Sequence, residues 1–91
     1  MGVSSKDKEL EQIFKALANR RRLAILRYIK EHKEASVGEI AGYLKLSFKA
    51  TSKHLAVLTS ADLLEKEQRS VQMFFSISPT IPDIARRALT I

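Results

Sequence analysis

The sequence predicts two short helices joined by a tight turn near its centre. The first covers residues 37–44 and begins with a capping box, for which Ser36 and Glu39 have the required spacing. The second covers residues 48–60, with Ser47 as its expected N-cap. Because the turn between them is about three residues long and the second helix is basic, this pair is typical of a helix-turn-helix motif.

Two amphipathic helices are predicted before this motif. Apolar residues recur at helical spacing between residues 7 and 18, where Ser4 or Ser5 is available as the N-cap. Asn19 is the expected N-cap of a second helix over residues 20–32. The residues that follow, 33–36, are predicted to be a polar connection.

After the helix-turn-helix segment the apolar period changes from helical to alternating. Residues 64–68 and 71–77 are predicted to form two strands, with Arg69 and Ser70 at the turn of the hairpin. Proline ends the second strand, and a short closing helix is expected to begin near Pro82.

Length and composition exclude several classes of protein. A chain of 91 residues is expected to form one mainly α domain over residues 1–91, with a small β-hairpin. Zero cysteines exclude disulfides and thiolate metal sites. The sequence has no Ser/His/acid set, phosphate-binding glycine loop or metal-ligand cluster, so we expect neither an enzyme nor a cofactor or metal site. It also has no bilayer-spanning apolar run and no secretory signal, so we expect a cytoplasmic protein without a membrane partner.

The positive charge is concentrated in two segments. The chain has a net charge of +6, from 16 Lys and Arg against 10 Asp and Glu. Residues 12–30 and 40–61 contain Lys and Arg but no acidic residue. This distribution indicates a polyanionic partner, although a general solubility surface is an equally simple explanation of the charge alone.

Three blocks of sequence carry a resemblance to a known family: LANRRRLAILRYI, LSFKATSKHLAVL and DLLEKEQRSVQMFFSIS. In this order and spacing they resemble the ArsR-type bacterial and archaeal transcriptional repressors, over about residues 13–77. The resemblance implies a winged helix-turn-helix fold, with a three-helix core, a hairpin wing, and additional first and last helices that build a dimer.

The departures from the family pattern concern the metal sites and the turns. The stretch that matches the Cys-containing sensor motif is residues 34–40, which has no sulfur ligand, so the resemblance does not carry over metal sensing. Asn19 and Arg20 replace the usual Asp-Pro. Asp62 and Ser70 stand where the family usually has glycine.

The second helix of the motif supplies the candidate base-reading residues. A recognition helix presents mainly its N-terminal residues to the major groove, and lysines four residues apart project together. An ordinary solvated helix face is the alternative, and Phe48 has the further alternative of folding back onto the core. The base-reading candidates are Phe48, Lys49, Ser52 and Lys53.

Candidates for contact with the DNA backbone come from three places in the chain. Two arginines lie at the positive end of a helix dipole, which is unfavourable unless a phosphate approaches. The wing tip is the second place and the recognition helix the third. The alternatives are exposed solubilising charge and, for the histidine, a half-buried packing role. These candidates are Arg20, Arg21, Ser47, His54, Gln68 and Arg69.

The first and last helices carry more apolar surface than a three-helix core needs, which usually marks an interface. The predicted dimer-interface residues are Leu10, Ile13, Phe14, Leu17, Ile84 and Leu89. The sequence therefore predicts a homodimeric regulator, most simply a repressor, that binds a pseudo-palindromic double-stranded DNA operator, and it indicates no particular inducer. The alternative is a winged-helix module for protein–protein assembly that does not bind DNA.

Overall fold

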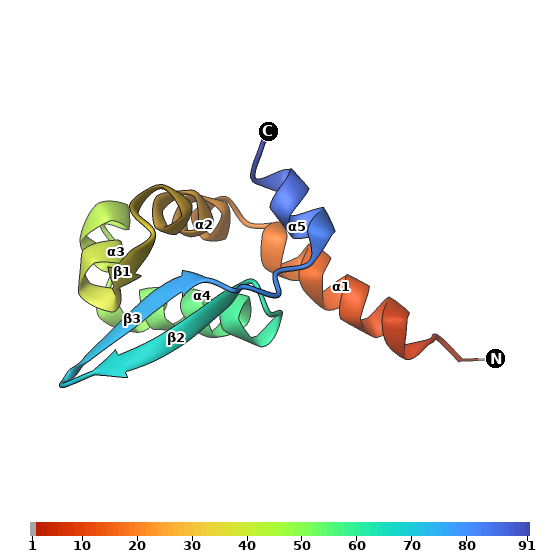
Figure 1. Ribbon diagram of the computed structural model, residues 1–91, viewed down its shortest axis with the longest axis horizontal. Coiled ribbons are helices and arrows are strands. Elements are labelled where there is room, and N and C mark those ends of the chain that lie inside the picture. The colour runs from red at the N-terminus through yellow and green to blue at the C-terminus, as the bar shows by residue number, and fades with distance from the viewer. Residues whose placement is uncertain (1) are drawn as a thin grey trace.

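Five helices and three strands make up the part of the chain that the computed structural model describes, residues 2–91 (Figure 1). In order, they are α1 (Ser5–Leu17), α2 (Arg20–His32), β1 (Glu34–Ser36), α3 (Val37–Leu44), α4 (Phe48–Ser60), β2 (Leu64–Arg69), β3 (Gln72–Ile77) and α5 (Asp83–Ala88). None of the helices within these residues is both long enough and apolar enough to cross a membrane. The order and pairing are those of a winged helix-turn-helix domain, which confirms the predicted fold class.

The starts of α1, α2, α3 and α4 agree closely with the sequence prediction because each of these four is set by a local side-chain bond. Ser36 and Glu39 form the reciprocal capping box at the start of α3, with bonds of 2.9 and 3.2 Å. At the starts of α1, α2 and α4, a side-chain oxygen accepts a hydrogen bond from a backbone N–H three residues on; these N-caps are Ser4, Asn19 and Ser47.

The prediction of a polar connection over residues 33–36 is wrong. Glu34–Ser36 form the edge strand β1, which pairs antiparallel with β3, so the sheet has three strands in the order β1-β3-β2. Ala35 lies opposite Phe75, and both are buried. Three residues are too few to show an alternating pattern, and this strand exists only because β3 supplies its hydrogen bonds.

The turn of the hairpin lies one residue later than predicted. Arg69 is the last residue of β2 and pairs with Gln72, so Ser70 and Val71 form the tip. Ser70 has φ of 58°, and Asp62, before β2, has φ of 60°. Positive φ is the conformation that glycine adopts without strain, which agrees with the glycine that the ArsR-type resemblance implies at these two positions.

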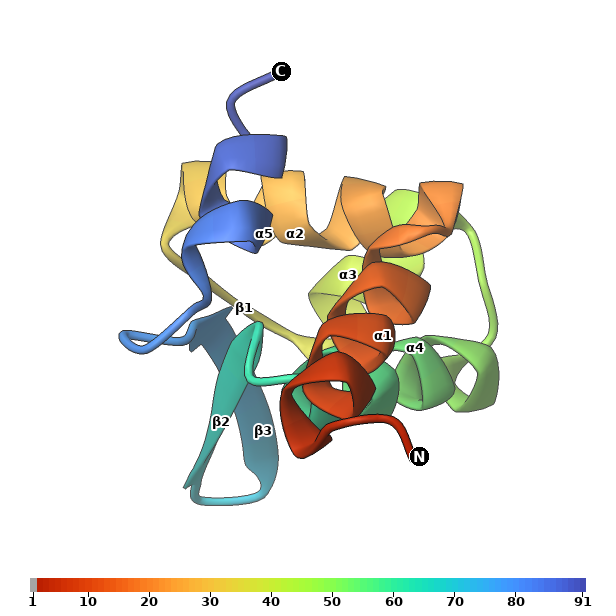
Figure 2. The same cartoon turned by 90° about the vertical axis from the view of Figure 1, so that its right-hand side faces the viewer.

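The core lies where α2, α3 and α4 meet the sheet. Its fully buried large side chains come from all of these elements: Ile25, Leu26, Ile29, Ile40, Thr51, Leu55, Leu58, Leu63 and Leu64. In both views α2 runs along one side of the molecule, while α4 and the β2–β3 hairpin occupy the opposite side (Figures 1 and 2). The helix α1 projects away from this body and accounts for the long axis of 46 Å.

Asp62 ties the start of the hairpin to the segment that follows it. Its two carboxylate oxygens accept hydrogen bonds from the hydroxyls of Ser78 and Thr80, both at 2.7 Å. These bonds lower the pKa of Asp62 below its ordinary value. The chain that leaves β3 is thereby held against the end of α4 before it enters α5.

Arg22 joins α1 to the helix-turn-helix core. Its guanidinium donates to the carbonyl oxygens of Ala16 and Lys15, both at 2.7 Å, and its Nη1 lies 3.4 Å from Nδ1 of His54. Arg22 thereby places a positive charge on the last carbonyls of α1, where the helix dipole is negative.

We expect the Arg22→Ala variant to lose about 2 kcal/mol of its free energy of unfolding, because two charge-assisted hydrogen bonds disappear and two helix-end carbonyls lose their partner. Arg21→Ala is the matched control, since Arg21 is exposed and its removal should change stability by less than about 0.5 kcal/mol. Urea unfolding of the three proteins at one fixed protein concentration measures both effects. Equal losses in the two variants would contradict the capping role.

Candidate nucleic-acid interface

One side of α4 is committed to the core, and this fixes which residues it exposes. Thr51, Leu55 and Leu58 are buried, and the Thr51 hydroxyl donates to the carbonyl of the N-cap Ser47 at 2.9 Å. With 3.6 residues per turn, the opposite face is built from the remaining positions of the first two turns.

All four predicted base-reading residues reach the surface of α4, with Lys49 and Lys53 opposite the core and Phe48 and Ser52 beside the wing. Phe48 is 64% exposed, Lys49 and Lys53 are exposed, and Ser52 is partly exposed. Lys49 and Lys53 are one turn apart and project from the same side. The helix has no acidic residue, so no carboxylate within α4 competes for these two ammonium groups.

The three consecutive arginines at the start of α2 have two different environments. Arg22 is turned inward toward α1, whereas Arg20 and Arg21 are exposed. Arg20 and Arg21 line a surface hollow together with Leu44, the last residue of α3. Their charges therefore flank the turn between α3 and α4 and remain available to a phosphate.

His54 faces Arg22 from the side of α4, and it is partly buried. Burial lowers the pKa of His54 below its ordinary value, and the positive charges of Arg22 and Arg21 lower it further. Because an arginine only donates, Nδ1 accepts from Arg22, and the neutral ring carries its proton on Nε2. His54 thus packs against a structural arginine, and its Nε2–H is the atom left for a backbone phosphate.

A groove between α4 and the wing contains a functional candidate that the sequence analysis missed. Phe48 and Ser52 of α4 line this groove with Lys66 of β2 and with Met73 and Phe75 of β3. Lys66 is paired with Phe75 in the sheet, so its side chain lies on the face toward α4. The sequence signal for Lys66 is strand alternation, because a residue two positions after the buried Leu64 lies on the same face of the strand.

Alternation divides the polar residues of the wing between two faces. Gln68 shares a face with Lys66, because they are two residues apart on β2. Glu67 and Arg69 lie on the other face, beside β1. The wing therefore presents polar and cationic groups toward α4 and a different set of charges away from it.

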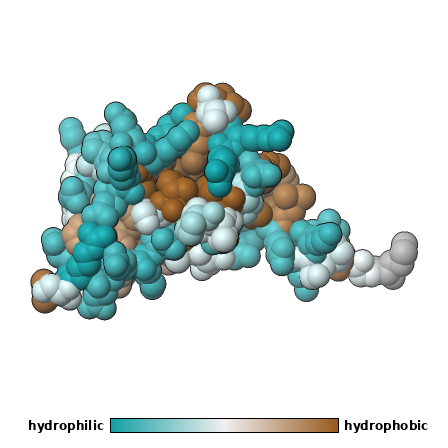
Figure 3. Space-filling model, in the orientation of Figure 1, coloured by the Kyte–Doolittle hydropathy of each residue, from teal (hydrophilic) through white to brown (hydrophobic). Residues whose placement is uncertain are grey.

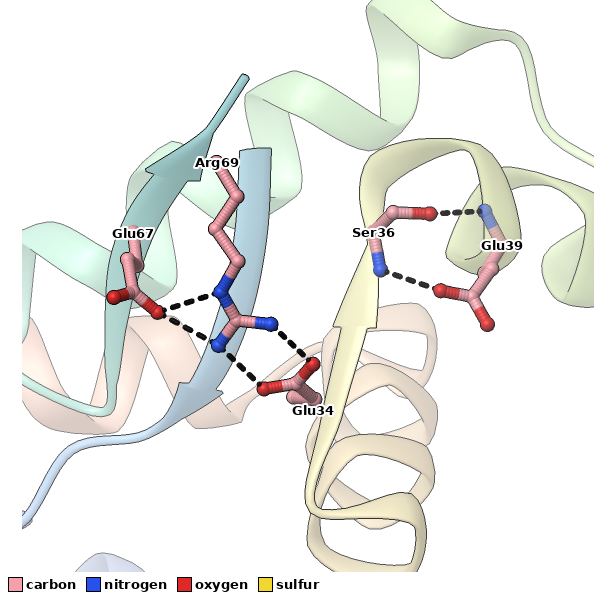
Figure 4. A network of polar contacts seen from close by, with 5 residues as sticks. All are labelled: Glu34, Ser36, Glu39, Glu67 and Arg69. Carbon is pink, nitrogen blue, oxygen red and sulfur yellow. Dashed lines mark hydrogen bonds and ion pairs between the residues drawn. The ribbon is translucent and has the colours of Figure 1, made fainter. Parts of the chain in front are cut away.

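Arg69, predicted to contact the DNA backbone from the hairpin tip, is paired with two carboxylates within the fold. Its guanidinium makes a bidentate bridge to Glu34 at 2.7 and 2.8 Å and bonds one oxygen of Glu67 at 2.7 and 2.9 Å (Figure 4). It also lies 4.7 Å from the centroid of the Phe74 ring. Arg69 lowers the pKa of Glu34, and the two carboxylates raise the pKa of Arg69 further above its ordinary value.

This cluster has two negative charges and one positive charge, so the outer face of the wing does not attract phosphate. The sequence did not reveal the bridge to Glu34, which is 35 residues away from Arg69 in the chain and belongs to the unpredicted strand β1.

Of the predicted dimer residues, three present substantial apolar surface. Leu10, Phe14 and Ile84 are 39%, 47% and 41% exposed. Ile13 and Leu17 are partly buried and pack against the core. Leu89 is corrected: it is buried within the single chain, because α5 packs this side chain inward.

No three histidine, aspartate or glutamate side chains within residues 2–91 come together as metal ligands. The two histidines are engaged separately. His32 stacks on Tyr28 with ring centroids 4.0 Å apart, and His54 faces Arg22.

Known proteins resemble this chain in sequence. The family model for bacterial regulatory proteins of the arsR family matches residues 19–66, a little over half of the chain. The transcriptional activator HlyU of Vibrio cholerae serotype O1 is 40% identical over 68 residues, which is 75% of this chain. The chain spans 62% of the length of that relative.

Solved structures resemble it over nearly its whole length. The structure of HlyU from Vibrio cholerae has a TM-score of 0.79 at 31% identity, covering 97% of this chain and 91% of that one. The homodimeric winged helix-turn-helix DNA-binding domain of a possible ArsR-family transcriptional regulator from Mycobacterium bovis has a TM-score of 0.79 at 26% identity. That match covers 98% of this chain and 82% of that one.

The lowered pKa of His54 predicts a loss of stability as pH falls below about 6.5, the ordinary value for histidine. Below that pH the unfolded chain takes up a proton on His54 before the folded chain does, so protonation favours unfolding. Thermal unfolding midpoints between pH 7 and pH 5 measure this, and His54→Gln, which retains an acceptor for Arg22, should reduce the fall. The His32→Gln control should retain the contribution of His54; an unchanged fall in His54→Gln would contradict the assignment.

Proposed function

The chain belongs to the arsR family of bacterial regulatory proteins, and from this premise we propose that it is a transcriptional regulator that binds double-stranded DNA sequence-specifically. It works by binding alone, without a catalytic step, and it acts in the cytoplasm, where the DNA is. The observation that carries the proposal is the exposed face of α4, where Lys49 and Lys53 project one turn apart from a helix without acidic residues.

We assign base reading to the N-terminal half of α4. A helix of this kind enters the major groove, where lysine donates to guanine O6 and N7 and an apolar group contacts a thymine methyl. Lys49, Ser52 and Lys53 supply the polar contacts in this assignment, and the exposed ring of Phe48 supplies the apolar one.

Backbone contacts flank α4 on two sides. Arg20 and Arg21 approach phosphates from beside the turn between α3 and α4. Lys66 does so from the inner face of the wing, and Gln68, two residues later on β2, does so from the same face. Ser47 and the Nε2–H of His54 complete the set at α4 itself. Such contacts set the position of the protein on the duplex, and they make its affinity depend on salt.

A homodimer follows from the apolar surface that α1 and α5 leave exposed, with Phe14, Leu10 and Ile84 as its main contacts. Two symmetric copies bring two α4 helices to half-sites about 34 Å apart, so the operator is a pseudo-palindrome. The similar Mycobacterium domain is described as homodimeric.

Repression is the simplest outcome of this binding, because a dimer on an operator that overlaps a promoter excludes RNA polymerase. The similar Vibrio cholerae protein is described as an activator. The position of the operator relative to the promoter decides between repression and activation. Footprinting of the protein on the DNA upstream of its own gene measures that position.

We expect Lys49→Ala and Lys53→Ala each to weaken binding to the specific operator by about 1–3 kcal/mol while changing non-specific binding much less. Arg20→Ala and Lys66→Ala should weaken all sequences about equally and reduce the slope of log K against log salt by about 0.9 each. Fluorescence anisotropy with operator and scrambled duplexes, at several salt concentrations, measures both quantities.

Arg69→Ala is the matched control for these wing and helix variants, since its charge is paired with Glu34 and Glu67 and its loss should leave the salt slope unchanged. If Lys49→Ala and Lys53→Ala leave operator affinity unchanged, the assignment of α4 is wrong. If the wild-type chain binds no duplex, the protein-assembly alternative replaces the proposal.

For the dimer, we expect Phe14→Glu to give a monomer at micromolar concentration, because it places a charge in the centre of the apolar surface. Val71→Glu is the control: Val71 is 93% exposed, but it lies at the wing tip, away from α1 and α5. Sedimentation equilibrium should give twice the mass of one chain for the wild type and the control. A wild-type species with the mass of one chain would exclude this dimer.

A further inference from the structure

A large hollow lies between the end of α2, the end of β3 and α5, on the side of the molecule away from α4. Its volume is about 700 Å³, within the range of small-molecule sites. Figure 3 shows apolar surface in this region, surrounded by hydrophilic side chains. None of the proposed DNA contacts lines it.

The floor of the hollow is apolar, and its rim is cationic. Its apolar lining includes Ile77, which is partly exposed, and Ile29 and Leu89, which are buried in the core, and the exposed Lys30, Lys33 and Arg86 line it as well. No acidic residue lines the hollow. Across residues 2–91, every ion pair involves Arg69, so these three cations have no carboxylate partner within the chain.

Lys33 keeps its side chain at this rim despite an unfavourable backbone. It ends α2 with φ of 74° and ψ of −40°, a conformation that costs a non-glycine residue about 1 kcal/mol or more. Glycine is the residue that adopts positive φ without this cost. The backbone conformation therefore does not favour a lysine here, and its ammonium group adds positive charge to the rim of the hollow.

We propose that this hollow binds a small organic acid, in which a carboxylate is attached to an aliphatic or aromatic body. The apolar body of such a ligand would cover the apolar floor of the hollow. Its carboxylate would pair with the three cations, which have no carboxylate partner of their own. A neutral apolar molecule leaves the cations unused, and an inorganic anion leaves the floor uncovered.

Such a ligand also bears on the proposed regulator. It contacts α5 through Arg86 and Leu89, while the exposed Ile84 of the same short helix belongs to the proposed dimer surface. Binding therefore braces α5 against α2. This consequence rests on the proposed function, but the binding site itself does not.

The test is a titration of the ¹⁵N-labelled chain with octanoate and with 4-phenylbutyrate, followed by amide chemical shifts. We expect saturable shifts confined to residues 29–33, 76–81 and 86–90. Octylammonium and octanol carry the same aliphatic body with a positive charge or none, and they should bind at least about tenfold more weakly, which is the effect of losing one charge-assisted interaction.

Two variants separate binding from folding. Lys33→Gly relieves the backbone at positive φ, so it should unfold at the same or a higher temperature than the wild type while binding octanoate about tenfold more weakly. Arg86→Gln should weaken octanoate binding similarly. The control is Lys8→Gln, which removes one positive charge from the exposed surface of α1 and should leave octanoate affinity unchanged.

Three results would overturn the proposal: no saturable shift with either acid, equal binding of octanoate and octanol, or shifts centred on α1. Loss of octanoate binding in Lys8→Gln as large as in Lys33→Gly would overturn it too, since binding would then follow net charge alone. Because these measurements contain no DNA, their failure leaves the proposed regulator untouched, and failure of DNA binding leaves this site untouched.

Discussion

Burial of one face of α4 is the constraint on which the rest of this structure depends. Thr51, Leu55 and Leu58 enter the same core as Leu26 and Ile40, so α4 cannot rotate about its axis without exposing them. Its charged positions, Lys49 and Lys53, are therefore held outward in solvent. The position of every proposed DNA contact, from the α2 arginines to the inner face of the wing, is defined relative to this packed helix.

The elements that could be predicted from sequence are those whose cause is local. N-caps such as Asn19 and the capping box of Ser36 act within four residues, so helix starts were correct. The strand β1 and the bridge between Arg69 and Glu34 were missed because both depend on residues far apart in the chain. Glu34 lies opposite Ser76 in the sheet, and its carboxylate bonds Arg69. The base-reading set follows from helical spacing alone, whereas the role of Lys66 needs the packing of the wing against α4.

Charge in this molecule is separated by face and not merely by segment. Of the three adjacent arginines, Arg22 bonds the end of α1, whereas Arg20 and Arg21 are exposed and can contact a polyanion. In the wing, the outer face pairs Arg69 with two carboxylates, which leaves the inner face as the cationic one. The net charge of +6 does not show how much positive charge each face of the molecule presents. Only the fold shows which cations are unpaired and can contact a polyanion.

The helix α5 contributes to both the proposed dimer surface and the hollow, which lie away from the proposed DNA contacts. It has six residues, begins without a side-chain cap bond, and is anchored by the buried Ala85 and Leu89. Ile84 points outward at the proposed dimer surface, and Arg86 reaches the rim of the hollow. A helix this short gains little stability from its own hydrogen bonds, so its position is set by what packs on it. A ligand on one side and a second copy on the other therefore act on the same weakly held element, which makes α5 the place where binding and dimerisation would be coupled.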